Sequence, residues 1–335
     1  MLEMNNSSRY PADVLIIGGG PAGLTTALSV ARNVHTAIVF DSQDYRNVRA
    51  NHFHMLPTWD GKDPLEFRDA ARENTLDNYE TIQFHNTKVS DVSRTEEGTF
   101  EAKDADGVVW FGHALVLATG VIDIMLDIPG FDECWGRSIF HCLFCHGYEQ
   151  RGSESSGVLA IDDVAPEPIA LHVSRNAAQL TKTVTLYTNG DEKQAGALVA
   201  AAGAQAPFIV DHRRITRFTL GRDNVGCTLT FEDGTSKDEA FIAHKPKHAL
   251  KSHDLAKQLG CEITQQGDIK VNPPFGETSV NGCFAAGDNS SFLKTTPNAI
   301  NVGSNAAAGV ASYVQSRKYG QKSLGEFLRG TAPQS

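Results

Sequence analysis

The chain has 335 residues, of which 41% are hydrophobic, so it is long enough for about two globular domains with buried cores. The formal net charge is -10 and no run of Lys or Arg occurs, which argues against nucleic acid and anionic membranes as partners. Residues 1–11 hold no apolar signal segment and no apolar stretch approaches the ~20 residues of a membrane span, so we expect a cytoplasmic protein with no membrane partner.

The N-terminal region predicts a β-α-β unit with a glycine-rich turn. An apolar strand at 13–17 leads into the turn, a helix follows over 24–32, and a second apolar run at 36–40 ends at Asp41. The turn fits the G-x-G-x-x-G pattern, in which backbone N–H groups at a helix N-terminus hold a pyrophosphate and a later acid binds a ribose hydroxyl. Asp41 lies 18 residues after the last glycine, so the unit predicts a dinucleotide site. The turn residues are Gly18, Gly20, Pro21, Ala22 and Gly23.

Further elements of this first domain are expected in two separate parts of the chain. A small antiparallel insertion over 83–111 precedes a buried strand at 114–118. From residue 245 onward the chain returns, with a strand that ends at Gly287-Asp288 and a helix over 299–316. A carboxylate after such a strand suits a group that holds the ribityl chain or pyrophosphate of a flavin dinucleotide.

A second β-α-β unit lies in mid-chain. It consists of a strand at 157–161, a helix over 169–180 and a strand at 184–187. The predicted fold class is therefore α/β, with two Rossmann-like nucleotide-binding domains.

The run His141-Cys142-Leu143-Phe144-Cys145-His146-Gly147 carries the most specific chemistry of the chain. Two cysteines at C-x-x-C spacing can close a small disulfide ring for two-electron thiol chemistry. A zinc site would need a second such pair or a histidine cluster, so we expect no metal. The remaining cysteines lack ligand spacing and are expected to be buried small hydrophobes; they are Cys134, Cys227, Cys261 and Cys283.

The second β-α-β unit lacks a phosphate-binding turn. After its first strand the chain continues as Asp162-Asp163-Val164, and no glycine occurs between Gly157 and Gly190. Two carboxylates in this position would repel a pyrophosphate. We therefore expect this unit to exclude a nicotinamide dinucleotide.

The chain resembles the low-molecular-weight thioredoxin reductases over nearly its whole length. The resemblance rests on the order of four motifs: the glycine-rich turn, Ala118-Thr119-Gly120, the cysteine pair and the strand that ends at Gly287-Asp288. The chain is more similar still to the dithiol oxidases that close disulfides in natural products such as gliotoxin, holomycin and romidepsin. The resemblance implies FAD as cofactor and a homodimer. It implies an FAD-binding domain at 1–122 and 245–335, interrupted at 123–244 by a degenerate NADPH-like domain that carries the redox disulfide.

Roles are carried over residue by residue. The resemblance implies that Cys142 meets the substrate thiol and that Cys145 is the sulfur nearest the flavin. His146 stands where thioredoxin reductases have an acid, and with His141 as second candidate it is expected to move protons. FAD contacts beyond the turn and Asp41 are expected from Arg46, Asn47, His54, Thr119, Gly120, Gly287, Asp288, Asn298, Ala299 and Ile300.

The resulting hypothesis is an FAD-dependent dithiol oxidase that closes a disulfide in a small-molecule dithiol of the epidithiodiketopiperazine type, with O2 as acceptor and H2O2 as product. Two alternatives stay open from the sequence. One is an NADPH-dependent thioredoxin reductase with a divergent site. The other is a flavin protein that binds a dithiol or senses redox state without turnover.

Overall fold

The computed structural model of the chain describes residues 11–331, which divide into two compact units. Unit 1 comprises the residues up to His52, Lys62–Ile122 and those from Ala249 onward; unit 2 comprises Phe53–Gly61 and Asp123–His248. The chain returns from unit 2 to unit 1 at Ala249, four residues after the predicted boundary at 245. The segment Phe53–Gly61, predicted to belong to the first domain, groups with unit 2. The expectation of no signal segment concerns residues that lie almost entirely outside the described range.

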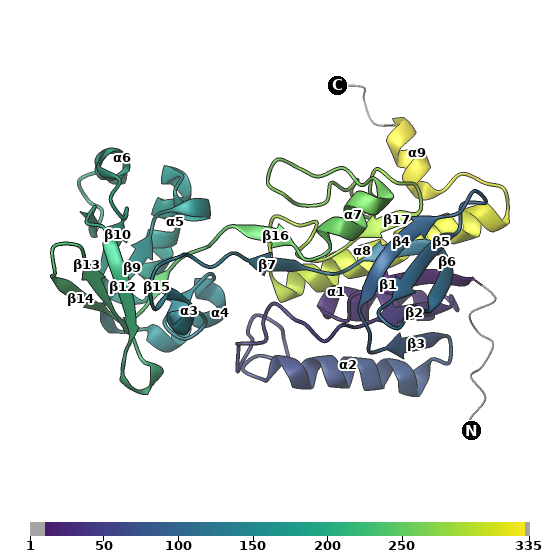
Figure 1. Ribbon diagram of the computed structural model, residues 1–335, viewed down its shortest axis with the longest axis horizontal. Coiled ribbons are helices and arrows are strands. Elements are labelled where there is room, and N and C mark those ends of the chain that lie inside the picture. The colour runs from purple at the N-terminus through teal and green to yellow at the C-terminus, as the bar shows by residue number, and fades with distance from the viewer. Residues whose placement is uncertain (1–10, 332–335) are drawn as a thin grey trace. The chain divides into compact units, whose positions relative to one another are not determined.

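Unit 1 is built on a seven-stranded sheet of order β3-β2-β1-β6-β5-β4, to which β17 adds by pairing with β6 (Figure 1). β1, β2, β3, β6 and β17 run parallel, and β4, β5 and β6 are antiparallel neighbours. The predicted antiparallel insertion is therefore wrong at its start: β3 belongs to the parallel sheet, because helix α2 provides the crossover from β2. The strands are β1 Ala12–Ile17, β2 Ala37–Phe40, β3 Ile82–His85, β4 Val89–Arg94, β5 Phe100–Asp104, β6 Val109–Leu117 and β17 Cys283–Ala285.

Helices cover both faces of this sheet because alternate residues of its central strand point to opposite sides. Leu15 and Ile17 belong to one core cluster together with Leu255 of α7. Val14 and Ile16 belong to a second cluster with the apolar residues of α1 and α8. The helices of unit 1 are α1 Pro21–Ala31, α2 Pro64–Asn78, α7 His253–Leu259, α8 Thr296–Lys318 and α9 Leu324–Thr331.

Unit 2 holds a five-stranded sheet of order β11-β10-β9-β15-β8, whose described pairings are all parallel, and a separate antiparallel sheet β12-β13-β14. Strands of both sheets are labelled in the teal and green part of Figure 1. The strands are β8 Ile139–Phe140, β9 Ser153–Leu159, β10 Thr181–Tyr187, β11 Phe208–Asp211, β12 Ile215–Leu220, β13 Cys227–Phe231, β14 Ser236–Glu239 and β15 Ile242–Ala243. The helices are α3 Phe131–Cys134, α4 Leu143–His146, α5 Glu167–Ala177 and α6 Glu192–Ala202. Where the chain passes between the units, β7 Val121–Asp123 pairs with β16 His248–Leu250.

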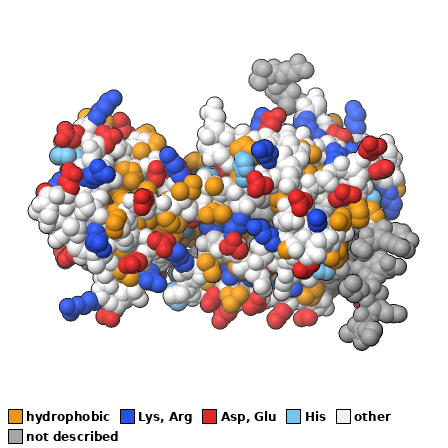
Figure 2. All heavy atoms as spheres, in the orientation of Figure 1, with side chains coloured by type: hydrophobic (Ala, Val, Ile, Leu, Met, Phe, Trp, Pro, Cys, Tyr) orange, Lys and Arg blue, Asp and Glu red, His pale blue; other side chains and the backbone are white. Residues whose placement is uncertain are grey.

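The two nucleotide-binding-type sheets confirm the predicted α/β class. Between residues 11 and 331, the helices do not combine the length and the apolar character that crossing a bilayer requires. Acidic and basic side chains are interspersed over the face drawn in Figure 2.

Candidate active site

The carboxyl ends of four parallel strands in unit 1 bring distant parts of the sequence to one edge. β1 is followed by Gly18, β2 by Asp41, β6 by Ala118-Thr119-Gly120 and β17 by Ala286-Gly287-Asp288. β1 lies between β2 and β6, and β17 pairs with β6 on its other side. Ligands of open α/β sheets bind at this edge, so the fold gathers most of the predicted cofactor residues where a dinucleotide would lie.

The glycine-rich turn divides into packing glycines and an open glycine. A Cβ added at Gly23 would lie 1.9 Å from the carbonyl oxygen of Gly18, and one at Gly18 would lie 2.2 Å from that of Ala118. A Cβ at Gly20 would meet nothing within 4 Å. Gly20 is also the N-cap of α1 and, as a glycine, provides no side-chain capping bond to the first N–H groups of the helix. Gly18 and Gly23 thus shape the turn, and Gly20 leaves room for a ligand.

Asp41 stands directly beside this turn and is buried. Its Oδ2 accepts a hydrogen bond from the Tyr45 hydroxyl at 2.6 Å, and its Oδ1 accepts one from the Gln43 N–H at 2.9 Å. Burial and the Asp41 carboxylate raise the pKa of Tyr45, so this phenol stays a donor. Each carboxylate oxygen can accept a further bond, which leaves capacity for a ribose hydroxyl.

Two arginines, Arg68 and Arg46, fix the segment 45–47 that follows Asp41. The Arg68 guanidinium lies 3.9 Å from the centroid of the Tyr45 ring, and its Nη1 donates to Asn47 Oδ1 at 3.2 Å. Arg46 Nη1 lies 2.9 Å from Asp288 Oδ2 across 242 residues of sequence. Arg46 and Asp288 were both predicted for cofactor binding, but their pairing could not be read from the sequence.

Polar groups after β6 and β17 are linked to one another. Thr119 Oγ1 lies 2.5 Å from Ser252 Oγ. Asn289 Nδ2 donates to the Leu117 carbonyl at 2.8 Å, while its Oδ1 is buried and has no partner. Lys294 Nζ donates to the Asp288 carbonyl at 2.7 Å and so fixes the loop that follows Gly287. Ser252, Asn289 and Lys294 were missed, because each precedes or follows an element without any motif of its own.

Helix α8 packs against the start of α1 through Gly303, its eighth residue. A Cβ on Gly303 of α8 would lie 2.5 Å from the Ala22 carbonyl, and Thr26 Oγ1 donates to the Gly303 carbonyl at 3.0 Å. The N-cap Thr295 accepts from the Asn298 N–H at 3.4 Å. Asn298 and Ala299 lie in the first turn of a helix packed against α1 and Ile300 follows directly, at the end where the helix dipole favours negative charge.

These residues fit the FAD that the resemblance implies. The open space at Gly20, the uncapped start of α1, the acid beside the turn and the unpartnered Asn289 oxygen are features that a dinucleotide would use. Gly120 also has a positive φ of 71° and open space at its missing Cβ.

His54 differs from the other predicted cofactor residues because it lies in the segment that groups with unit 2. Its Nδ1 is 3.3 Å from Asp60 Oδ1 and its Nε2 is 3.6 Å from Glu149 Oε1. Glu149 follows the cysteine motif by four residues. A role of His54 toward FAD stays a prediction.

Cys142 and Cys145 form a disulfide in unit 2, with their Cα atoms 5.3 Å apart. Cys142 is the N-cap of the four-residue helix α4, which contains Cys145. Both cysteines are half-buried, whereas Phe144 between them is 68% exposed. After α4 the chain makes a 3-10 turn at Tyr148–Gln150, and β9 begins at Ser153.

The histidines beside the disulfide are held by aromatic rings. The His146 ring stacks on Phe140 at a centroid distance of 5.2 Å and 22°, and the His141 ring lies 5.8 Å from Trp135. Both imidazoles are half-buried. Stacking on Phe140 restricts the plane of the His146 ring, whereas the His141 ring is tilted by 30° against Trp135.

In unit 2, the turn after β9, where a nucleotide-binding domain would hold a phosphate, is occupied by contacts with the protein's own side chains. β15 pairs in parallel with β9, so the residues after Ala243 lie beside the residues after Leu159. Asp163 is 3.6 Å from Lys245 Nζ, and Asp162 is 3.7 Å from Lys247 Nζ. Gln194 Nε2 donates at 2.7 Å to the carbonyls of residues 160 and 165, on either side of the turn. The sequence Lys245-Pro246-Lys247 directly after a strand was the signal that could have revealed this closure.

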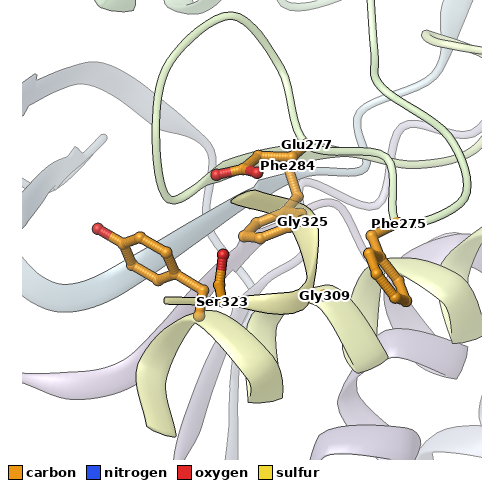
Figure 3. A pocket seen from close by; sticks show the side chains of 7 residues that line it. Phe275, Glu277, Phe284, Gly309, Ser323 and Gly325 are labelled. Carbon is orange, nitrogen blue, oxygen red and sulfur yellow. The ribbon is translucent and has the colours of Figure 1, made fainter. Parts of the chain in front are cut away.

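We assign the small recess beside α8 and α9 to the packing of unit 1 and not to ligand binding (Figure 3). Glu277 is buried there; its Oε1 accepts from the Gly282 N–H at 3.1 Å and its Oε2 pairs with Arg329 of α9. Because the Gly282 N–H and the Arg329 guanidinium both bind its carboxylate, Glu277 connects α9 to the rest of unit 1. Over residues 11–331, no three His, Cys, Asp or Glu side chains gather as a metal site would require.

Comparisons with known proteins agree with this geometry. Residues 12–192 match the family described as pyridine nucleotide-disulphide oxidoreductase. The chain is 45% identical to thioredoxin reductase tcpT of Claviceps purpurea, covering 93% of this chain and 97% of that one. It is 43% identical to thioredoxin reductase aclD of Aspergillus oryzae, covering 90% and 95%. An oxidoreductase of Agrobacterium tumefaciens has a similar crystal structure, with a TM-score of 0.79, 31% identity and coverage of 92% and 99%.

Proposed function

Since this chain belongs to the pyridine nucleotide-disulphide oxidoreductases and is a flavin thiol/disulfide oxidoreductase of thioredoxin reductase type, we propose that it is a dithiol oxidase. Its cofactor is FAD. The proposed substrate is a small-molecule dithiol of the epidithiodiketopiperazine type, which leaves as a cyclic disulfide while O2 becomes H2O2. We further propose that the protein acts as a homodimer in the cytoplasm.

The turn Asp162-Asp163 carries this proposal. A reductase of this family takes electrons from NADPH, and its second nucleotide-binding unit must accept a pyrophosphate. Here two carboxylates occupy that turn and pair with Lys245 and Lys247, the cations nearest to it. A pyrophosphate would meet repulsion from the carboxylates and would have to break both ion pairs.

The cysteine pair accounts for the thiol chemistry without a nicotinamide. One substrate thiolate attacks Cys142 Sγ, which breaks the bond to Cys145 and leaves Cys145 as a thiolate. The second substrate thiol attacks the substrate sulfur of this mixed disulfide and releases Cys142. The substrate leaves with a new S–S bond, and its two electrons stay on the cysteine pair. When bound, FAD supplies a two-electron acceptor that delivers the electrons to O2.

His146 is assigned to proton transfer because it follows Cys145 directly and its ring is held by Phe140. An imidazole titrates near neutral pH, so it can take the proton of an incoming thiol and return it. His141, on the other side of the motif, is the second candidate. The exposed ring of Phe144 gives the disulfide an apolar neighbour suited to an uncharged organic dithiol.

Aerobic turnover without nicotinamide tests the proposal. With a small dithiol such as dithiothreitol as probe, we expect one O2 consumed and one H2O2 formed per disulfide. The runner-up, a reductase, instead requires NADPH and reduces a protein disulfide such as that of thioredoxin; the names of the relatives favour it. A protein that only binds dithiols would release at most one disulfide per subunit. Either of these results would contradict the proposal.

Removing both charges from the turn of unit 2 should weaken the exclusion of NADPH. In Asp162→Asn/Asp163→Asn, Lys245 and Lys247 remain, so we expect the Kd for NADPH to fall by about 10-fold at low salt. Dithiol oxidation should be unchanged. A control with the same charge change on exposed acids of unit 2, Glu154→Gln/Asp238→Asn, should leave the Kd unaltered. Equal NADPH affinities of the unsubstituted protein and both variants, measured by calorimetry, would show that the carboxylates of the Asp162-Asp163 turn do not exclude NADPH.

A further inference from the structure

Lys294 carries a charge that is almost entirely withdrawn from solvent. Its side chain is 4% exposed, and it lies in the loop between β17 and α8. An ammonium that is buried loses its hydration, so it is stable there only when other acceptors bind its N–H groups. The contacts of Lys294 therefore show what this charge does in unit 1.

All three N–H groups of the ammonium can be matched to acceptors of the protein. Nζ donates to Asp268 Oδ1 at 2.7 Å, to the Asp288 carbonyl at 2.7 Å and to the Ser291 carbonyl at 2.8 Å. The Asp268 carboxylate supplies the opposite charge, and its side chain is 12% exposed. An ammonium has three donors and no acceptor, so these bonds leave none for a ligand. Lys294 can therefore act on a cofactor only through the residues that it holds.

The loop that contains Lys294 joins two elements of the candidate FAD site. At its start, Asp288 follows β17, and the Asp288 carboxylate lies 2.9 Å from Arg46 Nη1. At its end, Thr295 caps α8, and Asn298 lies in the first turn of that helix. Lys294 directly precedes Thr295, while its side chain reaches back to the Asp288 carbonyl. One residue thus connects both ends of the loop.

Further hydrogen bonds hold the same loop through its backbone. The Ile269 N–H donates to the Asn289 carbonyl at 2.8 Å, and Asn298 Nδ2 donates to the Leu293 carbonyl at 2.7 Å. Among the bonds of this loop, those of the Lys294 ammonium join its end to its start. Removing the ammonium should therefore release the two ends from each other.

We propose that Lys294 is a positioning residue for FAD, which sets Asp288 and the start of α8 in the cofactor-binding arrangement before FAD binds. A protein in which the binding-competent arrangement is only partly populated binds its ligand more weakly, in proportion to that fraction. Without the ammonium, the carbonyls of Asp288 and Ser291 lose their donor, and the loop can leave this arrangement. The inference depends on FAD as the cofactor and is independent of the proposed oxidase reaction.

FAD binding by the full chain tests this role. Lys294→Met alone would leave the Asp268 carboxylate unpaired in the interior, so it is combined with Asp268→Asn, which removes both charges. The protein is freed of FAD, and its melting temperature should stay close to that of the unsubstituted FAD-free protein. In a titration followed by flavin fluorescence, we expect the Kd for FAD to rise by at least about 10-fold.

Stopped-flow flavin fluorescence separates positioning from direct contact with the cofactor. If Lys294 prepares the site, the association rate of FAD should fall by the same factor as the affinity, while the dissociation rate stays unchanged. Loss of a group that contacts FAD would instead raise the dissociation rate.

Lys270→Met is the matched control. Lys270 also pairs with a carboxylate, Glu262, at 2.8 Å, but both side chains are more than half exposed, so the Kd for FAD should not change. The proposal is overturned if Lys294→Met/Asp268→Asn binds FAD as tightly as the unsubstituted protein. It is equally overturned if weaker binding comes entirely from faster dissociation, or if Lys270→Met weakens binding as much.

Discussion

Replacing Cys142 with serine is expected to abolish dithiol oxidation, with a loss of at least about 10³-fold in kcat, because no sulfur remains for the substrate thiolate to attack. FAD should stay bound, since Cys142 lies in unit 2 and the predicted FAD residues apart from His54 lie in unit 1. Turnover is measured as O2 consumption and FAD content by visible absorbance. Cys227→Ser, at a buried cysteine that the mechanism does not use, is the matched control and should retain activity.

Cys145→Ser should be equally inactive for a different reason. Cys142 then stands alone as a thiol, so the protein holds no disulfide bond that a substrate thiolate could break and no pair of sulfurs that could take up two electrons. Mass spectrometry should find the peptide 138–151 with one free thiol, at Cys142, and without bound substrate. Turnover close to that of the unsubstituted protein in either variant would refute the role assigned to that cysteine.

The glycines of the first turn should separate binding from folding. In Gly20→Ala the new methyl group meets nothing in the protein, so the chain should fold normally but lose FAD, because the methyl fills the space for the pyrophosphate. In Gly23→Ala the methyl would lie 1.9 Å from the Gly18 carbonyl, so the strand and helix must separate and the fold itself should lose several kcal/mol.

Thermal unfolding of the FAD-free proteins and FAD titration measure the two effects. Gly196→Ala, at an open position in α6, is the control and should change neither. If Gly20→Ala retained full FAD affinity, the turn would not be the pyrophosphate site. If Gly23→Ala unfolded at the temperature of the unsubstituted protein, the packing argument would fail.

The sequence was sufficient for features that depend on neighbours in the chain. Gly18, Gly20 and Gly23 predict the phosphate-binding turn because strand, turn and helix are contiguous in the chain. The C-x-x-C spacing is short enough to predict the Cys142–Cys145 disulfide directly. The α/β class followed from the same local alternation of strands and helices.

Features that depend on sheet order could not be predicted in this way. The ion pair between Arg46 and Asp288 joins residues 242 positions apart, and the strand order β2-β1-β6-β17 brings their loops to one edge of the sheet. The contact of Asp163 with Lys245 likewise requires β15 to lie next to β9. Helix α6 was missed because its run of alanines has little of the apolar and polar alternation by which amphipathic helices are recognised.

The most direct test of the oxidase is an anaerobic titration of the flavin. The purified holoprotein is mixed with NADPH, and separately with a small dithiol, while the visible absorbance of the flavin is followed. We predict bleaching by the dithiol and none by NADPH, reversed by air with formation of H2O2. Rapid bleaching by NADPH would mean that the Asp162-Asp163 turn does not exclude a nicotinamide, and the protein would then be a reductase.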